Sequence, residues 1–514
     1  MTDGQLILVG GSLLAAGLAA SLFAARFRVP ALVLVLGAGM LIGSDGTGWI
    51  EFDDYEVARR IGIVALALIL FEGGLASGWR EIRPVLRSAV SLALLGTILT
   101  ALLTGFVAAW LFDLSTLEGL LIGSIIAATD AAAVFSVLRT STLRRRLART
   151  LEGESGLNDP VAVLLVLGFI DWIENPGYGI VDMAGLFAQQ LSIGLAVGLA
   201  AGFAGAELLK RSRLATGGLY PVATLAIAAI AFGVADVMHG SGFLAVYLAG
   251  LVLGSREIPA RRTVFAFHEG LAWVAQVAMF FTLGLLVFPS QLGDVAPEAT
   301  IVALVSVAIA RPLATFFVTA LERYSARERI VLGWAGLRGA VPMVLATFPV
   351  IEGVPRSQEF FNIVFFAVLL STVLQGATLE ALARRLGLTT SEPALPRPLA
   401  DAGASQGLGA EVVEYPVASK DAVVGFHIRD LGLPRDALVN VIVRGGRAIP
   451  PRGSTKLLSG DVLHILIRSE AVQQIYPLLD RWRTGPIRPE IAGDEEVWMT
   501  MPVYRARPRD PGDV

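Results

Sequence analysis

The stretch Leu151-Glu-Gly-Glu-Ser-Gly-Leu-Asn-Asp-Pro160 decides how the rest of this sequence is interpreted. It contains three carboxylates, a hydroxyl and an amide, and it leads directly into an apolar run that extends to Ile170 and beyond. On a helix, the four polar residues from Glu154 to Asp159 lie within about one turn of each other. A charge at the centre of a bilayer costs about 2.5–3.5 kcal/mol on insertion scales, so an acid there usually marks the pathway of an ion or a proton.

A second acid, Asp130, lies upstream in a run of small and apolar residues from Ile125 to Val134, directly after Thr129. Two acids on neighbouring apolar spans, each beside a hydroxyl residue, predict a cation site built from oxygen ligands. A helix break at Asp130 would free backbone carbonyls to take part in that site, as in transporters with interrupted helices.

The composition indicates an integral membrane protein. Of the 514 residues, 54% are hydrophobic and only 17% are charged, against about 25% charged residues in soluble domains, and the mean hydropathy is +0.67. The formal net charge of −3 gives no sign of nucleic-acid binding, and the lack of cysteine excludes disulfides and thiol chemistry. The first apolar segment lacks a basic leader and a cleavage motif, so we expect a retained span rather than a signal peptide.

Apolar windows that can cross about 30 Å of hydrocarbon recur from the N-terminus to about Leu386, and we count thirteen. They are 5–24, 30–43, 57–76, 85–112, 117–139, 156–174, 183–209, 218–237, 242–255, 268–288, 297–321, 328–350 and 358–383.

Basic residues alternate between the loops and thereby predict the orientation. Arginines and lysines follow every odd-numbered span, for example at 80–87 and 144–149, whereas intervening loops such as 171–182 and 289–298 contain none. Because cytoplasmic loops carry the excess of Lys and Arg, the chain is expected in the cell membrane with its N-terminus outside and everything after the last span in the cytoplasm.

The periodicity changes after the last span. The sequence predicts a transmembrane domain at 1–386, a Pro- and Ser-containing linker at 387–410, a small cytoplasmic α/β domain at 411–484 and a tail at 485–514. Strands are expected at 411–417, 438–443 and 462–468, with a turn at 444–447 and a helix at 471–482.

A further motif, Leu337-Arg-Gly-Ala-Val-Pro342, lies in the middle of the twelfth span, where its Gly and Pro predict a second helix break. The two broken spans, the fifth and the twelfth, are symmetric about the seventh, as expected of an inverted repeat. Arg338 needs a carboxylate partner in this setting, and Glu154 is the best candidate by residue class.

Each of these residues also has a simpler interpretation. Asp130 could cap a helix end or extend towards the membrane surface, and Asp159, which precedes Pro160, could be only an N-cap. Arg338 could face an aqueous funnel without a partner. Glu72, in the stretch Phe71-Glu-Gly-Gly-Leu75, could be an interfacial residue. Arg311, inside the eleventh span, has no partner that the sequence identifies.

Four motifs together resemble the monovalent cation:proton antiporter-1 family, in its NhaP-like branch. They are Phe71-Glu-Gly-Gly-Leu75, Thr129-Asp-Ala-Ala-Ala-Val-Phe135, Glu154-Ser-Gly-Leu-Asn-Asp-Pro160 and Leu337-Arg-Gly-Ala-Val-Pro342, and they occur in order across residues 5–385. Many members have Pro before the Thr-Asp pair, where this chain has Ala128, and this departure resembles a subgroup of potassium/proton antiporters.

The resemblance implies roles for these residues and an assembly state. Asp130, Asp159, Ser155 and the backbone of Thr129 would ligate the monovalent cation, with Glu72 nearby and Asn158 orienting the site. Glu154 would form a structural ion pair with Arg338. The family works as a homodimer in which a rigid dimer domain holds a moving core domain.

Residues 411–470 resemble the C-terminal half of RCK domains, known as TrkA-C, through Gly425-Phe-His-Ile-Arg-Asp-Leu431 and Leu458-Ser-Gly-Asp-Val-Leu463. Such modules regulate transport by dimerising around a small ligand, which in some cases is a nucleotide. No other cofactor is expected.

The function expected from these features is exchange of a monovalent cation, K⁺ or Na⁺, for H⁺. Two carboxylates a few Å apart raise each other's proton affinity, so such a site binds either a proton or a cation, and alternating exposure exchanges the two. Asn158 cannot take up a proton, which predicts electroneutral exchange. The alternatives are a gated cation channel, for which no filter-like loop is evident, and an intramembrane aspartyl protease, whose Gly-x-Gly-Asp and Tyr-Asp motifs flank neither acid.

Overall fold

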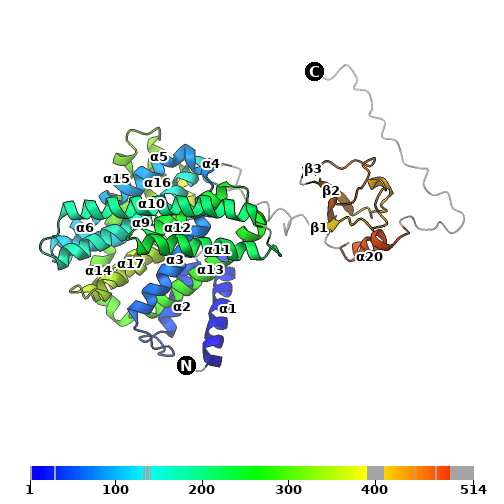
Figure 1. The fold of residues 1–514 in the computed structure, drawn as a ribbon. Coiled ribbons are helices and arrows are strands. Elements are labelled where there is room, and N and C mark those ends of the chain that lie inside the picture. Colours follow the sequence, from blue (N-terminus) through cyan, green and yellow to red (C-terminus); the bar gives the residue numbers. More distant parts are fainter. Residues whose placement is uncertain are drawn as a thin grey trace, which may run out of the picture. The chain divides into compact units, whose positions relative to one another are not determined.

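The computed structural model describes residues 3–27, 31–130, 133, 134, 138, 141–212, 214–390, 410–445, 447–468 and 472–486 (Figure 1). The chain forms two compact units, Met1–Pro396 and Arg397–Val514. The greater part of the predicted linker, 391–409, and of the predicted tail, 487–514, lies outside the described residues.

The first unit is built from helices. Its first half contains α1 (Asp3–Phe27), α2 (Ala31–Ile42), α3 (Tyr55–Ser77), α4 (Trp79–Ile82), α5 (Leu86–Ser91), a π-helical turn (Leu92–Gly96), α6 (Thr97–Leu111), α7 (Thr116–Ala127) and α9 (Arg145–Glu174). Its second half contains α10 (Ile180–Arg211), α11 (Leu219–Val237), α12 (Gly242–Ser255), α13 (Arg261–Leu285), α14 (Pro289–Val305), a second π-helical turn (Ser306–Ala310), α15 (Arg311–Val318), α16 (Ala326–Trp334), α17 (Ala340–Ile351) and α18 (Ser357–Arg385).

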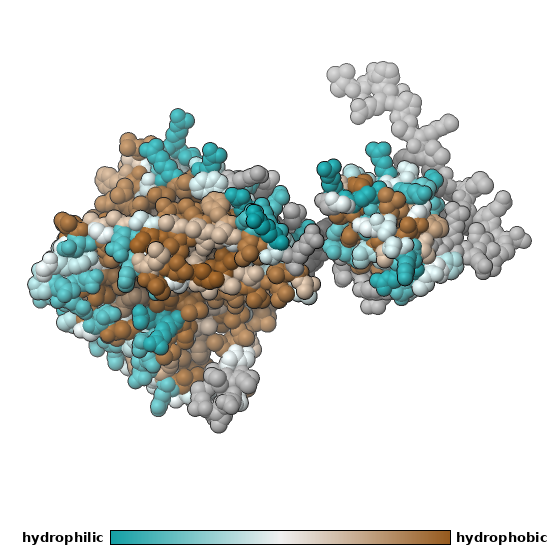
Figure 2. Space-filling view, viewed as in Figure 1, coloured by the Kyte–Doolittle hydropathy of each residue, from teal (hydrophilic) through white to brown (hydrophobic). Residues whose placement is uncertain are grey.

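These helices confirm a polytopic, all-α membrane protein. Among the described residues, eight helical stretches are long and apolar enough to cross a membrane, and shorter apolar helices such as α2, α7, α12 and α17 accompany them. Figure 2 shows apolar side chains over much of the visible face of this unit, and large ones such as Trp110 and Phe317 are 80% and 67% exposed. The number of membrane crossings stays a prediction.

Both predicted helix breaks are present. α7 ends at Ala127 and residues 128–130 are not helical, while residues 335–339 separate α16 from α17. One boundary differs clearly from the expectation of a span at 156–174, because α9 begins at Arg145 and runs without interruption through Pro160. The inverted repeat that the two breaks suggest stays a prediction.

Close packing of backbones brings the helices around the site together. α3 and α12 approach so closely that a Cβ added at Gly254 would lie 2.1 Å from the carbonyl oxygen of Leu75. Small residues permit such contacts between helices in a lipid environment, where dispersion forces rather than water drive helix association.

In its described residues, the second unit is a four-stranded antiparallel sheet with a short 3₁₀ helix (Ile428–Asp430) and one α-helix. Its strands are β1 (Ala410–Pro416), β2 (Ala437–Arg444), β3 (Arg447–Ile449) and β4 (Val462–Arg468), in the order β1-β4-β2-β3, and α20 (Val472–Thr484) follows them. The predicted turn at 444–447 is confirmed as a hairpin in which Arg444 pairs with Arg447. Trp482 of α20 is fully buried and donates a hydrogen bond to the carbonyl of Leu431 at 2.9 Å, so the helix packs into the core of the unit.

Candidate cation site at two crossing helix breaks

The two helix breaks touch each other at Asp130. The backbone N–H of Asp130 donates to the carbonyl of Leu337 at 2.9 Å, and the N–H of Ala340 donates to Asp130 Oδ2 at 2.9 Å. Ala340 is the first residue of α17, so this carboxylate caps the N-terminus of a half-helix, where a negative charge is favoured. The capping interpretation of Asp130 is therefore correct, although the helix that it caps belongs to the other broken span.

Arg338, in the other helix break, contacts the C-terminal end of a half-helix, as Asp130 contacts an N-terminal end. Its Nε donates to the carbonyl of Ile126 at 2.5 Å, at the C-terminal end of α7, and its Nη2 donates to Ser306 Oγ at 2.7 Å. A cation at a helix C-terminus is stabilising. Each interrupted span thus supplies a charged side chain that offsets the partial charge at the half-helix end of the other span.

Gly339 is required at this crossing by the space available. A Cβ added to it would lie 1.8 Å from Asp130 Oδ2. Any side chain at this position would displace the carboxylate from the start of α17, which explains the glycine of the Leu337–Pro342 motif.

The polar face of α9 completes the site. Thr129 Oγ1 lies 3.2 Å from Ser155 Oγ and accepts a hydrogen bond from Asn158 Nδ2. Asp159 is 0% exposed, and its two carboxylate oxygens, like Asn158 Oδ1, have no hydrogen-bond partner among the described residues. Since α9 begins at Arg145, the interpretation of Asp159 as an N-cap is wrong.

A buried carboxylate without a donor is costly unless a positive charge neutralises it. The carboxylate of Asp159 is also within electrostatic reach of Asp130. Within the part of the chain that the structure describes, no three His, Asp or Glu side chains gather to hold a metal ion. A buried carboxylate without a hydrogen-bond partner among the described residues, on the same helix as Ser155 and Asn158, fits a proton or a weakly held monovalent cation.

The expected ion pair between Glu154 and Arg338 is not present in the described part of the chain. Glu154 instead accepts a hydrogen bond from Arg311 Nη2, and both side chains of this pair are almost completely buried. The π-helical turn at Ser306–Ala310 directly precedes Arg311, and such turns shift the direction of the side chains that follow them. The sequence showed both arginines inside apolar spans but carried no signal for this turn, so it could not tell which of them faces Glu154.

A second buried acid, Glu152, was not identified as a paired residue from the sequence. It accepts hydrogen bonds from Arg149 and from Ser77 at the end of α3, each at 2.6 Å. Arg149 also forms an ion pair with Glu81 of α4, in which its Nε lies 3.2 Å from Glu81 Oε2. The spacing of Arg149 and Glu152, three residues apart on one helix, was the available signal.

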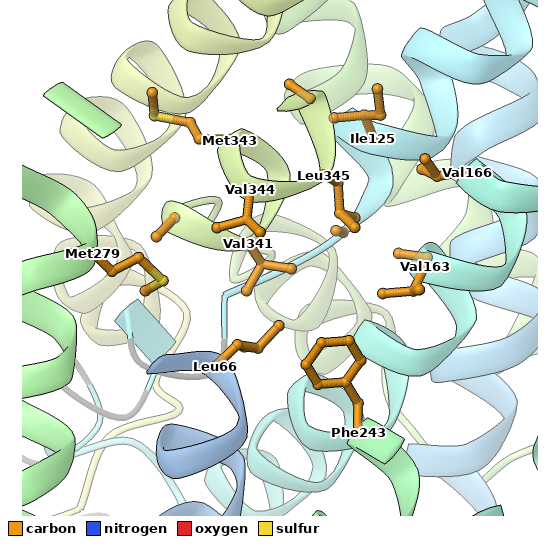
Figure 3. Packing of buried hydrophobic residues seen from close by; sticks show 14 of the residues in the cluster. Leu66, Ile125, Val163, Val166, Phe243, Met279, Val341, Met343, Val344 and Leu345 are labelled. Carbon is orange, nitrogen blue, oxygen red and sulfur yellow. The ribbon is translucent and has the colours of Figure 1, made fainter. Parts of the chain in front are cut away.

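Buried apolar side chains from four helices pack against one another near the start of α17. Figure 3 shows Leu66 of α3, Phe243 of α12 and Val163 of α9 gathered around Val341 of α17, and all of them are buried. Glu72 is also buried, at 8% exposure, on α3. Its proximity to the cation stays a prediction.

The chain is similar to proteins of known families. Residues 12–385 match the family model described as sodium/hydrogen exchanger, transmembrane, and residues 412–480 match the TrkA-C domain. The chain is 36% identical over 479 residues to the K(+)/H(+) antiporter NhaP2 of Shewanella baltica strain OS223, covering 92% of this chain and 83% of that protein. It is 37% identical over 480 residues to the K(+)/H(+) antiporter NhaP of Alkalimonas amylolytica, covering 92% of this chain and 83% of that protein.

A solved structure has the same fold in the helical unit. The sodium proton antiporter MjNhaP1 from Methanocaldococcus jannaschii superposes with a TM-score of 0.64 at 24% identity, covering 74% of this chain and 99% of that chain. At this identity the likeness concerns the fold alone.

Proposed function

This chain belongs to the sodium/hydrogen exchanger family, and we propose that it exchanges a monovalent cation, preferentially potassium, for protons across the cell membrane. The observation that carries the proposal is the carboxylate of Asp159, which is fully buried and has no donor among the described residues. Such a group persists in an apolar interior only with a proton or a cation bound. The two charges exclude each other, which is the requirement for exchange.

Asp159, Ser155 and the backbone of Thr129 are proposed to bind the cation. The proposal is supported by the contact between the hydroxyls of Ser155 and Thr129 and by the hydrogen bond from the amide of Asn158 to the Thr129 hydroxyl. Asp130 contributes the second carboxylate while it caps α17. Glu72, which is buried on α3, is proposed as a supporting acid.

The exchange is proposed to be electroneutral. Glu154 is neutralised by Arg311, and Asn158 cannot take up a proton. Asp159 then carries one proton in one direction and one monovalent cation in the other, so no net charge moves. The preference for potassium rests on the two relatives whose names specify K⁺.

Transport requires the site to face the two sides of the membrane in turn. We propose that the helices that carry it, α7, α9 and α17, move as a core against α3, α12 and α13, within a homodimer whose basic loops face the cytoplasm. The TrkA-C unit is proposed to regulate this movement by binding a small ligand.

The test is proton flux in proteoliposomes driven by potassium or sodium gradients, with the membrane potential clamped at several values. We expect potassium-driven flux that changes little with potential and disappears in Asp159→Asn. The matched control is Asp113→Asn, which removes an exposed acid outside the site. Unchanged flux in Asp159→Asn would contradict the site, a strict sodium requirement would contradict the cation, and a steep voltage dependence would contradict the stoichiometry.

A further inference from the structure

Two segments far apart in the sequence pair at the end of the helical unit. Leu143 and Thr389 form an antiparallel bridge. The N–H of Arg144 donates to the carbonyl of Leu388 at 2.9 Å, and the N–H of Thr390 donates to the carbonyl of Thr142 at 2.7 Å. Residues 387–390, which the sequence places in the linker, are thus joined to the helical unit by main-chain hydrogen bonds.

Side chains fasten the same pairing. Glu380 of α18 accepts hydrogen bonds from Ser141 Oγ and Thr142 Oγ1, both at 2.7 Å. Leu143 and Leu388 are 0% and 3% exposed and belong to one buried apolar cluster with Leu147 of α9. We call residues 141–144 and 387–390, with Glu380, the clamp.

One side of the clamp leads directly to the cation site. Residues 141–144 connect the chain that follows Asp130 to the start of α9, which carries Ser155 and Asp159. The apolar cluster of the clamp also includes Leu337, whose carbonyl accepts the N–H of Asp130. A displacement of the clamp is therefore applied to both elements that hold the cation.

The other side of the clamp leads to the TrkA-C unit. Thr390 is the last described residue before 391–409, and β1 of the second unit begins at Ala410. Among the described contacts of the helical unit, the hydrogen bond between Thr390 and Thr142 is therefore the one nearest in the chain to the second unit.

We propose that the clamp is the point at which the TrkA-C unit controls transport, by holding or releasing the N-terminal end of α9. This inference rests on the proposed exchange function and on its regulation by the second unit. It requires the pairing between residues 142 and 390 to change when the second unit changes state.

The absence of cysteine allows the pairing to be locked. Leu143 and Thr389 are directly opposite each other, and the two main-chain hydrogen bonds lie on either side of them rather than between them. In such a non-hydrogen-bonded antiparallel pair the Cα atoms are about 4.5 Å apart. This distance lies within the range for a disulfide. Leu143→Cys combined with Thr389→Cys is made in the full chain and in a chain that ends at Pro396. Exchange is measured in proteoliposomes before and after oxidation, and again after reduction.

When the cysteines are reduced, we expect removal of residues 397–514 to change the exchange rate at a fixed pH by about five-fold or more. This factor is the low end of ordinary coupling between two sites. After oxidation, the full and shortened chains should exchange alike. A difference that survives oxidation would overturn the proposal, as would a reduced protein that is indifferent to the shortening. No exchange in the reduced full chain would instead contradict the proposed function.

A second pair of variants tests the clamp without cysteines. Thr390→Pro removes the donated N–H, and Glu380→Ala removes both side-chain contacts; each full-length variant should exchange as the shortened chain does. The matched control is Glu359→Ala, which removes an acid from an exposed ion pair near the other end of α18 and should leave regulation intact. If both clamp variants exchanged as the unmodified full-length chain does, the proposal would be overturned.

Discussion

Arg311 donates a hydrogen bond to Glu154, and the two side chains are 2% and 1% exposed. The pair joins α15 to α9 at the residue directly before Ser155 and a little more than one helical turn before Asp159. Because the pair is buried, water cannot solvate either charge, so the loss of one partner leaves the other charge uncompensated.

Arg311→Met should therefore lower the free energy of unfolding by about 3–5 kcal/mol, the usual cost of breaking a buried pair. Adding Glu154→Gln should recover much of that loss, because no isolated charge remains. Unfolding is followed thermally in detergent. The control cycle pairs Glu154→Gln with Arg338→Met, whose effects should be additive to within about 0.5 kcal/mol. A strong coupling in the control cycle and none in the first would show that Glu154 pairs with Arg338.

Substitutions of Asp159 and of Asp130 should change the stability of the protein in opposite directions, although both acids are proposed to be needed for exchange. Asp159→Asn removes a buried carboxylate without a donor and should stabilise the protein at neutral pH by about 1–3 kcal/mol, the cost of an unsatisfied buried group. Asp130→Ala removes the cap of α17 and should destabilise it by about 0.5–2 kcal/mol. Thermal unfolding in cation-free buffer gives both values. Equal destabilisation by the two variants would contradict the different environments of the two acids.

Gly339→Ala should abolish exchange while leaving a folded protein. The added Cβ would overlap with Asp130 Oδ2, so the carboxylate must leave the start of α17 and the cation loses a ligand. Exchange in proteoliposomes and the elution profile in detergent are the two measurements. Gly293→Ala is the control, because a Cβ there meets no atom within 4 Å. Normal exchange in Gly339→Ala would mean that the contact between the breaks is not part of the site.

The second unit should lose stability in acid through Asp461. Burial raises the pKa of this carboxyl, but the hydrogen bonds from Arg444 and from the Leu458 N–H lower it more, so its pKa lies below the ordinary value for an aspartate. A lowered folded-state pKa gives stability that is present above the unfolded pKa and is lost as the pH falls through the folded value. Urea unfolding of the isolated unit between pH 5 and 2 should show this decline, and Asp461→Asn should remove part of it.

Asp436→Asn is the control for this measurement. Asp436 lies 3.4 Å from Arg468, but the two side chains are 48% and 71% exposed, and exposed pairs contribute little to stability. An equal effect of the two substitutions would contradict a special role for the buried contact of Asp461.

Sequence patterns identified most of the helices, both breaks and three of the four strands of the second unit, because each depends on local chemistry; β3 (Arg447–Ile449) was not predicted. Apolar length predicts a span, and Gly and Pro inside Leu337–Pro342 predict a break. Partners across the bundle were harder to predict. The choice of Arg311 over Arg338 for Glu154 depends on a π-helical turn, and the capping of α17 by Asp130 depends on how two distant breaks cross. Neither leaves a periodic signal in the sequence.

The apolar layer in Figure 3 has a mechanical consequence. Leu66 and Phe243 on one side, and Val163 and Val341 on the other, have no polar atoms in their side chains, and their attraction depends little on direction. Sliding these four side chains past one another exchanges one apolar contact for a similar one, while the hydrogen bond from Ser77 of α3 to Glu152 of α9 lies outside this layer. The layer can therefore shear with low friction while it continues to exclude water.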